Sequence, residues 1–313
     1  MIKLITSTIL LLSLIACVSS NKKNDTAKNK VKQNSNINFS KLKQVNTLKF
    51  KTSESCSSSS DKFNSYTWNK LVNIANTCLY KKNYKNLISV ANFLSTNHNE
   101  LPFGPYFKSF YFMNKNLNLK ALWLIDSAIE KQGDIGIFHY QKSIILNKLK
   151  YTGASKESAR TAVKLEPDNF GAQLLLGQLE LQAGNNKKAL EHALKAKELN
   201  KNNSNVKTLL ADLYFVTGDY KNAITHLGKL KSSKATKNEI NFKLAYSFEK
   251  LENRAKSIYF YKKIEAIKRS NLLSVYGLDV NDKIKEMEVE VAKLEQKTRQ
   301  PSNKKDKKNK GGK

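Results

Sequence analysis

The sequence predicts an all-α fold built from about six helical hairpins and closed by a C-terminal helix. The first observation is a repeat, because residues 170–203 and 204–237 share one pattern of small and aromatic residues. Three pairs of small residues stand 34 positions apart in these two segments: Gly177 and Ala211, Gly184 and Gly218, Ala189 and Ala223. The second observation is that the period extends in both directions without an insertion. A period of this length is typical of structural units that stack on their own copies.

The small residues have a physical role in a helical hairpin. Gly177 and Ala211 stand where two helices cross, and a larger side chain there would overpack the contact. Gly184 and Gly218 stand at the turn between the two helices, where glycine adopts a positive φ at little cost. Asp219 follows the second glycine and is expected to cap the next helix.

The period and the residue pattern resemble the tetratricopeptide repeat. This resemblance implies a right-handed α-solenoid over residues 61–271, because one hairpin cannot bury its apolar face alone. Steps of 34 residues give units at 68–101, 102–135, 136–169, 170–203, 204–237 and 238–271. The outer units depart from the pattern with Ser109 and Ser143 at the crossing, Asn116, Lys150 and Glu252 at the turn, and Ser257 in the second helix.

Residues 1–16 have the features of a signal peptide. Lys3 supplies a positive charge, and Leu4–Ile15 is an apolar run shorter than the ~20 residues that span a bilayer. The run ends in Leu-Ile-Ala-Cys, which resembles the lipobox of bacterial lipoproteins and implies cleavage before a lipid-modified Cys17. The alternative is an ordinary secretory signal that happens to be followed by a cysteine.

The lipobox resemblance implies an outer-membrane lipoprotein that faces the periplasm, since no Asp directly follows Cys17. In an organism with a single membrane, the same anchor would lie in the outer leaflet of the cell membrane. The rest of 17–60 is poor in apolar residues and contains nine lysines against Asp25 and Glu54. We expect a disordered basic tether that lets the folded part stand off the membrane.

The 34-residue pattern stops after Asn271, and 272–299 is expected to contain one last helix. Ile284, Met287, Val291 and Leu294 form a narrow apolar stripe at helical spacing. Such a helix covers the open end of a repeat stack, and the alternative is a pairing helix for a partner. Residues 300–313 are Lys-rich and are expected to be disordered.

The net charge of the chain is +29, with 55 Lys and Arg against 26 Asp and Glu. One interpretation is a solvated surface rich in lysine, and the other is attraction of the Lys-rich tail to anionic lipid or an acidic polymer. Nucleic acid is not an expected partner, because the chain carries an export signal and no base-stacking module is visible.

Cys56 and Cys78 allow two hypotheses. Cys78 is either a buried thiol, or it pairs with Cys56 in an oxidising compartment and pins the tether to the first unit. The sequence contains no metal-binding spacing, phosphate loop or nucleophile motif. We therefore expect no cofactor, no metal and no enzymatic activity.

The resemblance implies that the first helix of each unit lines a concave groove. The positions that would face inward are mostly apolar or aromatic, which favours a protein-binding surface. The alternative is that these side chains are buried by packing or covered by the chain itself. The residues are Phe103, Tyr106, Phe110, Met113, Tyr140, Ile144, Asn147, Leu174, Gln178, Leu181, Asp212, Phe215, Phe242 and Tyr246.

Together these features predict a membrane-anchored scaffold that holds a peptide or helix of a partner protein and assists assembly of an envelope complex. The plan resembles pilotin lipoproteins, which implies, as an alternative, an assembly factor for an outer-membrane secretin of a type IV pilus or a secretion system. A third alternative is a structural tether that binds acidic polymer or lipid through its basic tail.

Overall fold

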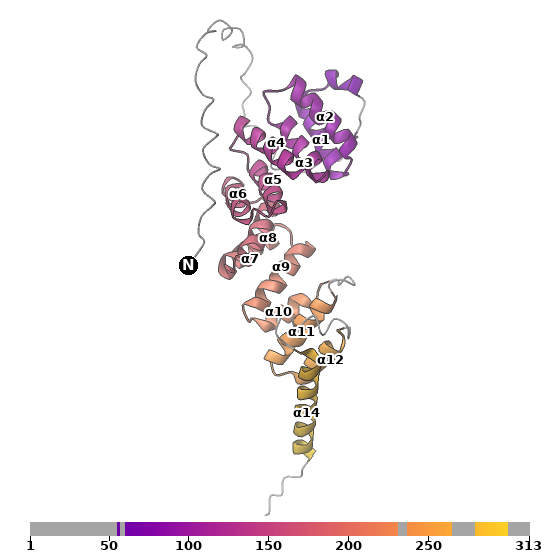
Figure 1. The fold of residues 1–313 in the computed structure, drawn as a ribbon, viewed down its shortest axis with the longest axis vertical. Helices are drawn as coiled ribbons and strands as arrows, with labels where there is room; N and C mark the ends of the chain where they lie inside the picture. Colours follow the sequence, from indigo (N-terminus) through magenta and orange to yellow (C-terminus); the bar gives the residue numbers. More distant parts are fainter. Residues whose placement is uncertain (1–54, 57–59, 231–236, 265–278, 300–313) are drawn as a thin grey trace, which may run out of the picture. The chain divides into compact units, whose positions relative to one another are not determined.

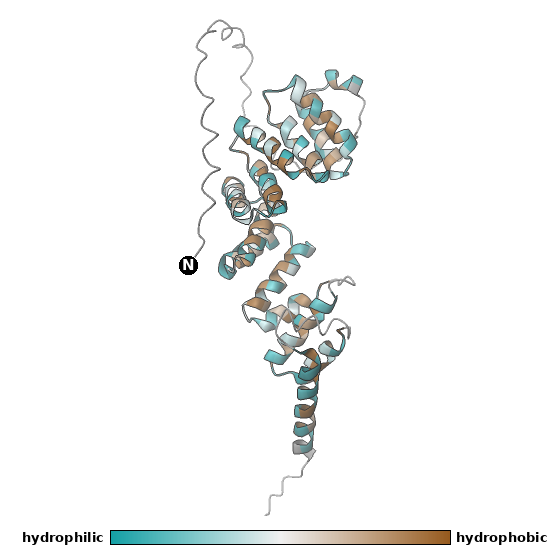
Figure 2. Ribbon diagram, viewed as in Figure 1, coloured by the Kyte–Doolittle hydropathy of each residue, from teal (hydrophilic) through white to brown (hydrophobic). Residues whose placement is uncertain are grey.

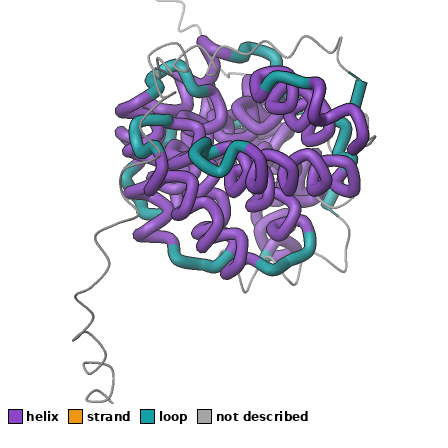
Figure 3. The backbone as a smooth tube through the Cα atoms, turned by 90° about the horizontal axis from the view of Figure 1, so that it is seen from above, coloured by secondary structure: helices purple, strands orange, loops and turns teal. Residues whose placement is uncertain are grey.

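The computed structural model describes residues 55–56, 60–230, 237–264 and 279–299. These residues belong to one compact unit, 46–313. They form one 3-10 helix, η2 (Ser60–Ser65), and thirteen α-helices, and no strand occurs within them (Figures 1 and 3). The all-α fold of repeated hairpins is thereby confirmed. The expected signal peptide, Cys17, most of the tether and the tail lie outside the described residues.

Twelve of these helices form six antiparallel pairs. The pairs are α1 (Trp68–Tyr80) with α2 (Tyr84–Asn97), α3 (Phe103–Asn114) with α4 (Asn118–Lys131), α5 (Gly136–Lys148) with α6 (Thr152–Leu165), α7 (Phe170–Gln182) with α8 (Asn186–Leu199), α9 (Ser204–Val216) with α10 (Tyr220–Leu227), and α11 (Lys237–Lys250) with α12 (Arg254–Lys262). Each second helix also packs on the next first helix. Every first helix begins within one residue of the start of a 34-residue unit.

The turn inside each hairpin shows the same period. One residue between the two helices has a positive φ in all six hairpins, and these residues are spaced by 34 along the chain: Lys82, Asn116, Lys150, Gly184, Gly218 and Glu252. The values run from 55° at Lys82 to 79° at Gly218. The left-handed conformation is therefore a property of the hairpin, and four hairpins impose it on a residue with a side chain.

The helix crossings are filled by small buried side chains. Ala75, Ser109, Ser143, Gly177, Ala211 and Ala245 occupy the crossing position in successive hairpins and are all buried. In the third hairpin, Ser143 Oγ donates to the carbonyl of Ser155 (2.8 Å), and Ser155 Oγ donates to the carbonyl of Ser143 (2.9 Å). Serine therefore replaces alanine there without leaving a buried hydroxyl unpaired.

Side-chain caps fix the start of several helices. Asn169 accepts from the backbone N–H of Ala172 at the start of α7, and Asp219 accepts from that of Asn222 at the start of α10. By contrast, α4 and α6 begin after Leu117 and Tyr151, which make no side-chain capping bond. These two starts lack a stabilising bond that a polar residue would supply.

The last helix, α14 (Val280–Arg299), covers the final hairpin. Val280, Ile284 and Met287 are buried in one cluster with Phe242 and Tyr261. Leu294, farther along the expected apolar stripe, is more than half exposed. Most of α14 is hydrophilic (Figure 2), and no helix among the described residues is long and apolar enough to cross a bilayer.

Candidate functional site

The expected groove residues all lie on first helices, from α3 to α11. None of them is fully exposed: ten are half-buried and four are buried. The structure therefore divides the expected groove into a part that is packed into the core and a part that still reaches a cavity.

Phe103 and Tyr106 belong to the packed part, and the expectation that they line an open groove is wrong. Phe103 stacks on Trp68 with ring centroids 6.0 Å apart and meets the edge of Phe138 at 6.3 Å. Tyr106 lies 4.9 Å from Phe138 and is 5% exposed. This burial is the main cause that raises the pKa of the Tyr106 phenol. Aromatic residues at these positions fill the contact between successive first helices.

Leu174 and Phe242 are corrected in the same way. Leu174 packs in the cluster that joins the fourth and fifth hairpins, with Leu209 among its members. Phe242 lies between Tyr246 and Tyr261, 6.1 and 6.2 Å from their ring centroids, in the cluster covered by α14. All four side chains were expected to line the groove. They are buried instead, because large apolar groups at these positions pack on the neighbouring helix.

Four other expected groove residues do come together. Asn147 of α5, Gln178 and Leu181 of α7 and Asp212 of α9 line one cavity of about 370 Å³. We call it the α5–α7–α9 groove. Its other lining residues come from the same helices: Leu175, Leu179, Gln182, Asn205, Thr208 and Leu209. The wall combines leucine side chains with amide and hydroxyl groups that can both donate and accept hydrogen bonds.

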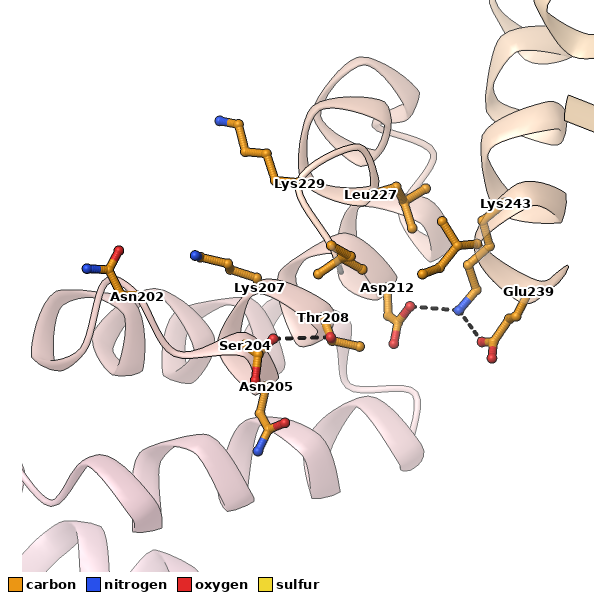
Figure 4. Close-up of a pocket in the computed structure, with 12 residues that line it drawn as sticks. Asn202, Ser204, Asn205, Lys207, Thr208, Asp212, Leu227, Lys229, Glu239 and Lys243 are labelled. Atoms are coloured by element: carbon orange, nitrogen blue, oxygen red, sulfur yellow. Dashed lines mark hydrogen bonds and ion pairs between the residues drawn. The ribbon is translucent and has the colours of Figure 1, made fainter. Parts of the chain in front are cut away.

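A second cavity of about 620 Å³ continues from the first along α9 (Figure 4). The two cavities share Asn205, Thr208 and Asp212. The second is closed on its far side by residues of α10, α11 and the chain just after α10, including Leu227, Lys229, Leu230, Glu239, Ile240 and Lys243.

A buried lysine fixes the wall of this second cavity. Lys243 Nζ of α11 lies 2.7 Å from Asp212 of α9 and 2.5 Å from Glu239 (Figure 4). Burial lowers the pKa of Lys243, but the carboxylates of Asp212 and Glu239 outweigh it and raise the pKa above its ordinary value. The signal for this residue was present in the sequence, since the same repeat position holds Leu175 and Leu209 in the preceding units.

The remaining expected residues line neither cavity. Phe110, Met113, Tyr140, Ile144, Phe215 and Tyr246 are half-buried. The rings of Phe110 and Tyr106 pack edge to face with centroids 5.1 Å apart, and the rings of Phe215 and Tyr246 do so with centroids 5.6 Å apart. All six side chains lie on first helices, outside both cavities.

Cys56 and Cys78 form a disulfide in the structure, which joins the segment before η2 to α1. The amide of Asn86 also donates to the carbonyl of Cys56 at 3.0 Å. Within the described part of the chain, no group of three His, Cys, Asp or Glu side chains is arranged to hold a metal ion.

The comparisons with known proteins agree on the repeat. The family model "Tetratricopeptide repeat" matches residues 150–213. A comparison with curated proteins finds no significant match. Among solved structures, PilF of Pseudomonas aeruginosa is 14% identical with a TM-score of 0.54, and the match covers 70% of this chain and 96% of that chain.

Two further solved structures match. YrrB, described as a TPR protein with an unusual peptide-binding site, is 16% identical with a TM-score of 0.53, over 60% of this chain and 96% of that one. The Cut9–Hcn1 assembly of the APC/C is 16% identical with a TM-score of 0.50, over 73% of this chain and 44% of that one. At these identities the likeness is one of fold.

Proposed function

We propose that this chain, which carries tetratricopeptide repeats, is a scaffold that holds an extended segment of a partner protein in the α5–α7–α9 groove. The observation that carries the proposal is the lining of the groove. Asn147, Gln178 and Gln182 supply amides from two helices, and Asn205 and Thr208 supply an amide and a hydroxyl from a third.

An extended polypeptide fits this lining for a chemical reason. Each residue of a peptide backbone offers one N–H and one C=O, and a side-chain amide can pair with both kinds of group. Leu175 and Leu181 supply apolar contact for the side chains of the bound segment. A concave surface with a few convergent polar groups is the usual form of a binding site.

The charge of the wall disfavours an acidic ligand at the centre of the groove. Asp212 is its one charged residue, and it is held in place by Lys243. We therefore expect a neutral or weakly basic segment to bind there. None of the described residues that line this cavity is a lysine, so the groove lacks the basic residues that would bind an acidic peptide.

The test is a matched pair of substitutions. Thr208→Arg introduces a long side chain into the groove, and Thr225→Arg introduces the same side chain on α10. Both threonines are exposed, and both hydroxyls donate to the carbonyl four residues earlier, at 3.1 and 3.0 Å. The two variants should therefore have equal effects on folding.

The readout is the set of random peptides that a phage library enriches on the immobilised chain, measured again by fluorescence polarisation. Peptides should bind the parent and Thr225→Arg equally and bind Thr208→Arg at least tenfold more weakly. Equal binding by both variants, or no enrichment on the parent, would contradict the proposal.

Membrane anchoring is a separate part of the proposal and rests on the sequence before and including Cys17. In its native host, the chain should incorporate a clickable palmitate analogue, and Cys17→Ser should abolish the label. A label that persists in Cys17→Ser would remove the lipobox as the source of attachment. We further propose that the chain lies at the periplasmic face of an outer membrane, because no Asp directly follows Cys17. Sucrose-gradient fractionation tests which membrane holds the chain.

A pilotin-like role is the narrower alternative. It is supported by the joint presence of a lipobox-like segment and a repeat stack similar in fold to PilF. The test is the oligomeric state of the host's secretin on gels when the chain is deleted. Loss of the oligomer, restored by the parent and not by Thr208→Arg, would favour this role, and unchanged assembly would exclude it.

A further inference from the structure

We propose that the start of α4 docks on the surface of an anionic lipid bilayer. Three large apolar side chains within seven residues point into solvent there: Leu117 is 52% exposed, Leu119 66% and Trp123 68%. Leu119 and Trp123 are four residues apart and so lie on one face of the helix. We call these three residues the α4 patch.

The α4 patch is not a product of the repeat. Leu117 occupies the capping position at which α2, α10 and α12 have Asn83, Asp219 and Asn253, each of which accepts a backbone hydrogen bond. An exposed leucine there gives up the cap and adds apolar surface in contact with water. The missing cap lowers stability, and the exposed apolar surface is unfavourable unless something covers the leucine.

Lysines surround the α4 patch. Lys120 Nζ lies 4.1 Å from the ring centroid of Phe112, and Lys115 Nζ lies 6.0 Å from that of Tyr111. The pKa of Lys108, on α3, is lowered mainly by burial and further by the nearby positive charge of Lys120. Within the described residues, neither Lys115 nor Lys120 takes part in an ion pair. Their charges are therefore available to an anionic surface.

The surrounding sequence is almost free of acidic residues. From Lys62 to Ile125, both included, there are eight lysines and one acidic residue, Glu100, and Asp126 is the next acidic residue. The turns of the flanking hairpins repeat the combination of an exposed tyrosine with lysines. Tyr80 precedes Lys81 and Lys82, and Tyr151 follows Lys148 and Lys150.

This combination fits a bilayer surface better than an acidic protein. Tryptophan and tyrosine are favoured at the membrane interface, where an apolar ring meets polar headgroups, and clustered lysines are attracted to anionic lipids. The α4 patch lines neither of the two cavities described above. A fluid headgroup layer can cover such a surface without shape complementarity.

Trp123 provides a local reporter, because the chain has two tryptophans and the other, Trp68, stacks on Phe103. We would use the full chain with Trp68→Phe, and with Cys17→Ser to remove the acylation site. Vesicles of phosphatidylglycerol should shift the Trp123 emission to shorter wavelength, and lipids with brominated acyl chains should quench it. Vesicles of phosphatidylcholine should do neither, and added salt should reverse the shift.

Paired substitutions separate the α4 patch from the overall positive charge. Lys115→Gln with Lys120→Gln should weaken partitioning into phosphatidylglycerol vesicles by about 25-fold, at roughly fivefold per lysine. Lys187→Gln with Lys188→Gln removes the same charge from the first turn of α8 and should have a much smaller effect. Leu119→Ser should weaken partitioning by about tenfold, and Leu194→Ser on α8 should not change it.

Each contrary result has a definite meaning. If phosphatidylglycerol vesicles neither shift nor quench Trp123, or if both lysine pairs weaken partitioning equally, the proposal is wrong. If the emission shifts with protein concentration alone, the α4 patch binds a second copy of the chain. If poly-glutamate shifts the emission and vesicles do not, the surface recognises an acidic protein. Both of these last results overturn the proposal.

Discussion

At the scale of single residues, each hairpin turn requires a positive φ at one residue, and the type of that residue sets how much free energy this conformation costs. Gly184 and Gly218 meet this requirement freely, and their role was predicted from the sequence. Lys150 at φ 65° and Glu252 at φ 58° meet it with a side chain present. The sequence did not predict an unchanged turn at Lys150 and Glu252, since neither is a glycine. The turn is nevertheless the same, because the packing of the two helices imposes the conformation.

Lys150→Gly should therefore stabilise the chain. The left-handed conformation costs a residue with a side chain about 1 kcal/mol more than glycine, and Lys150 is exposed and makes no ion pair within the described residues. Urea unfolding should show a higher midpoint at unchanged slope. The control, Lys148→Gly at the end of α5, should lower stability by up to ~1 kcal/mol, and an equal response of both variants would contradict the argument.

Glu180 is a second residue whose role depends on its surroundings. Its carboxylate is 1% exposed and accepts from Arg160 Nη2 and Asn185 Nδ2, both at 2.6 Å. Burial alone would raise its pKa, but the bonds from Asn185 and Arg160 and the charge of Lys156 outweigh burial and hold the pKa below the ordinary 4.5. A carboxylate with a lowered pKa stabilises the fold fully above its ordinary pKa, and this contribution is lost as the pH falls further.

Glu180→Gln should therefore destabilise the chain by about 2 kcal/mol at neutral pH. The difference from the parent should shrink as the pH falls below about 4.5, because the unfolded parent then binds a proton that the folded carboxylate binds only at lower pH. Denaturant unfolding at several pH values measures this. Glu157→Gln is the control, because that carboxylate also pairs with Arg160 but is mostly exposed. A difference that stays constant with pH would refute the assignment.

At the scale of elements, the contact between α2 and α3 depends on a glycine that the repeat pattern did not identify. A Cβ at Gly104 would lie 2.8 Å from the backbone nitrogen and 2.9 Å from the Cα of Ser95. The backbone of α2 would have to move to admit it. Gly104 lies in the first turn of α3, and only the packed helices show what faces it.

Gly104→Ala should lower stability by about 1–3 kcal/mol, the usual cost of overpacking, in spite of the better helix propensity of alanine. The matched control is Gly153→Ala in α6, where an added Cβ would meet nothing within 4 Å. That variant should gain up to ~1 kcal/mol. Thermal unfolding of both variants is the measurement, and a gain in stability for Gly104→Ala would show that the contact can relax.

At the scale of the whole molecule, periodicity predicted the helix pairs and their order, because small residues at crossings and turns are set by backbone geometry. The sequence prediction assigned all the inward positions to one groove and did not divide them into core and groove. The four buried residues stand at the second or fifth place of their units, whereas the four that line the α5–α7–α9 groove stand at the ninth or twelfth place. The ion pair between Lys243 and Asp212 joins residues 31 positions apart on different helices, and nothing in a single sequence indicates that these two side chains meet.

The most direct test of the central claim is site-specific photo-crosslinking in the native host. A benzophenone side chain at position 178 lies in the α5–α7–α9 groove, and one at position 188 lies on the exposed first turn of α8. We expect a discrete adduct with a partner polypeptide from position 178 and none from position 188. The same adduct from both positions, or adducts from position 188 alone, would contradict it.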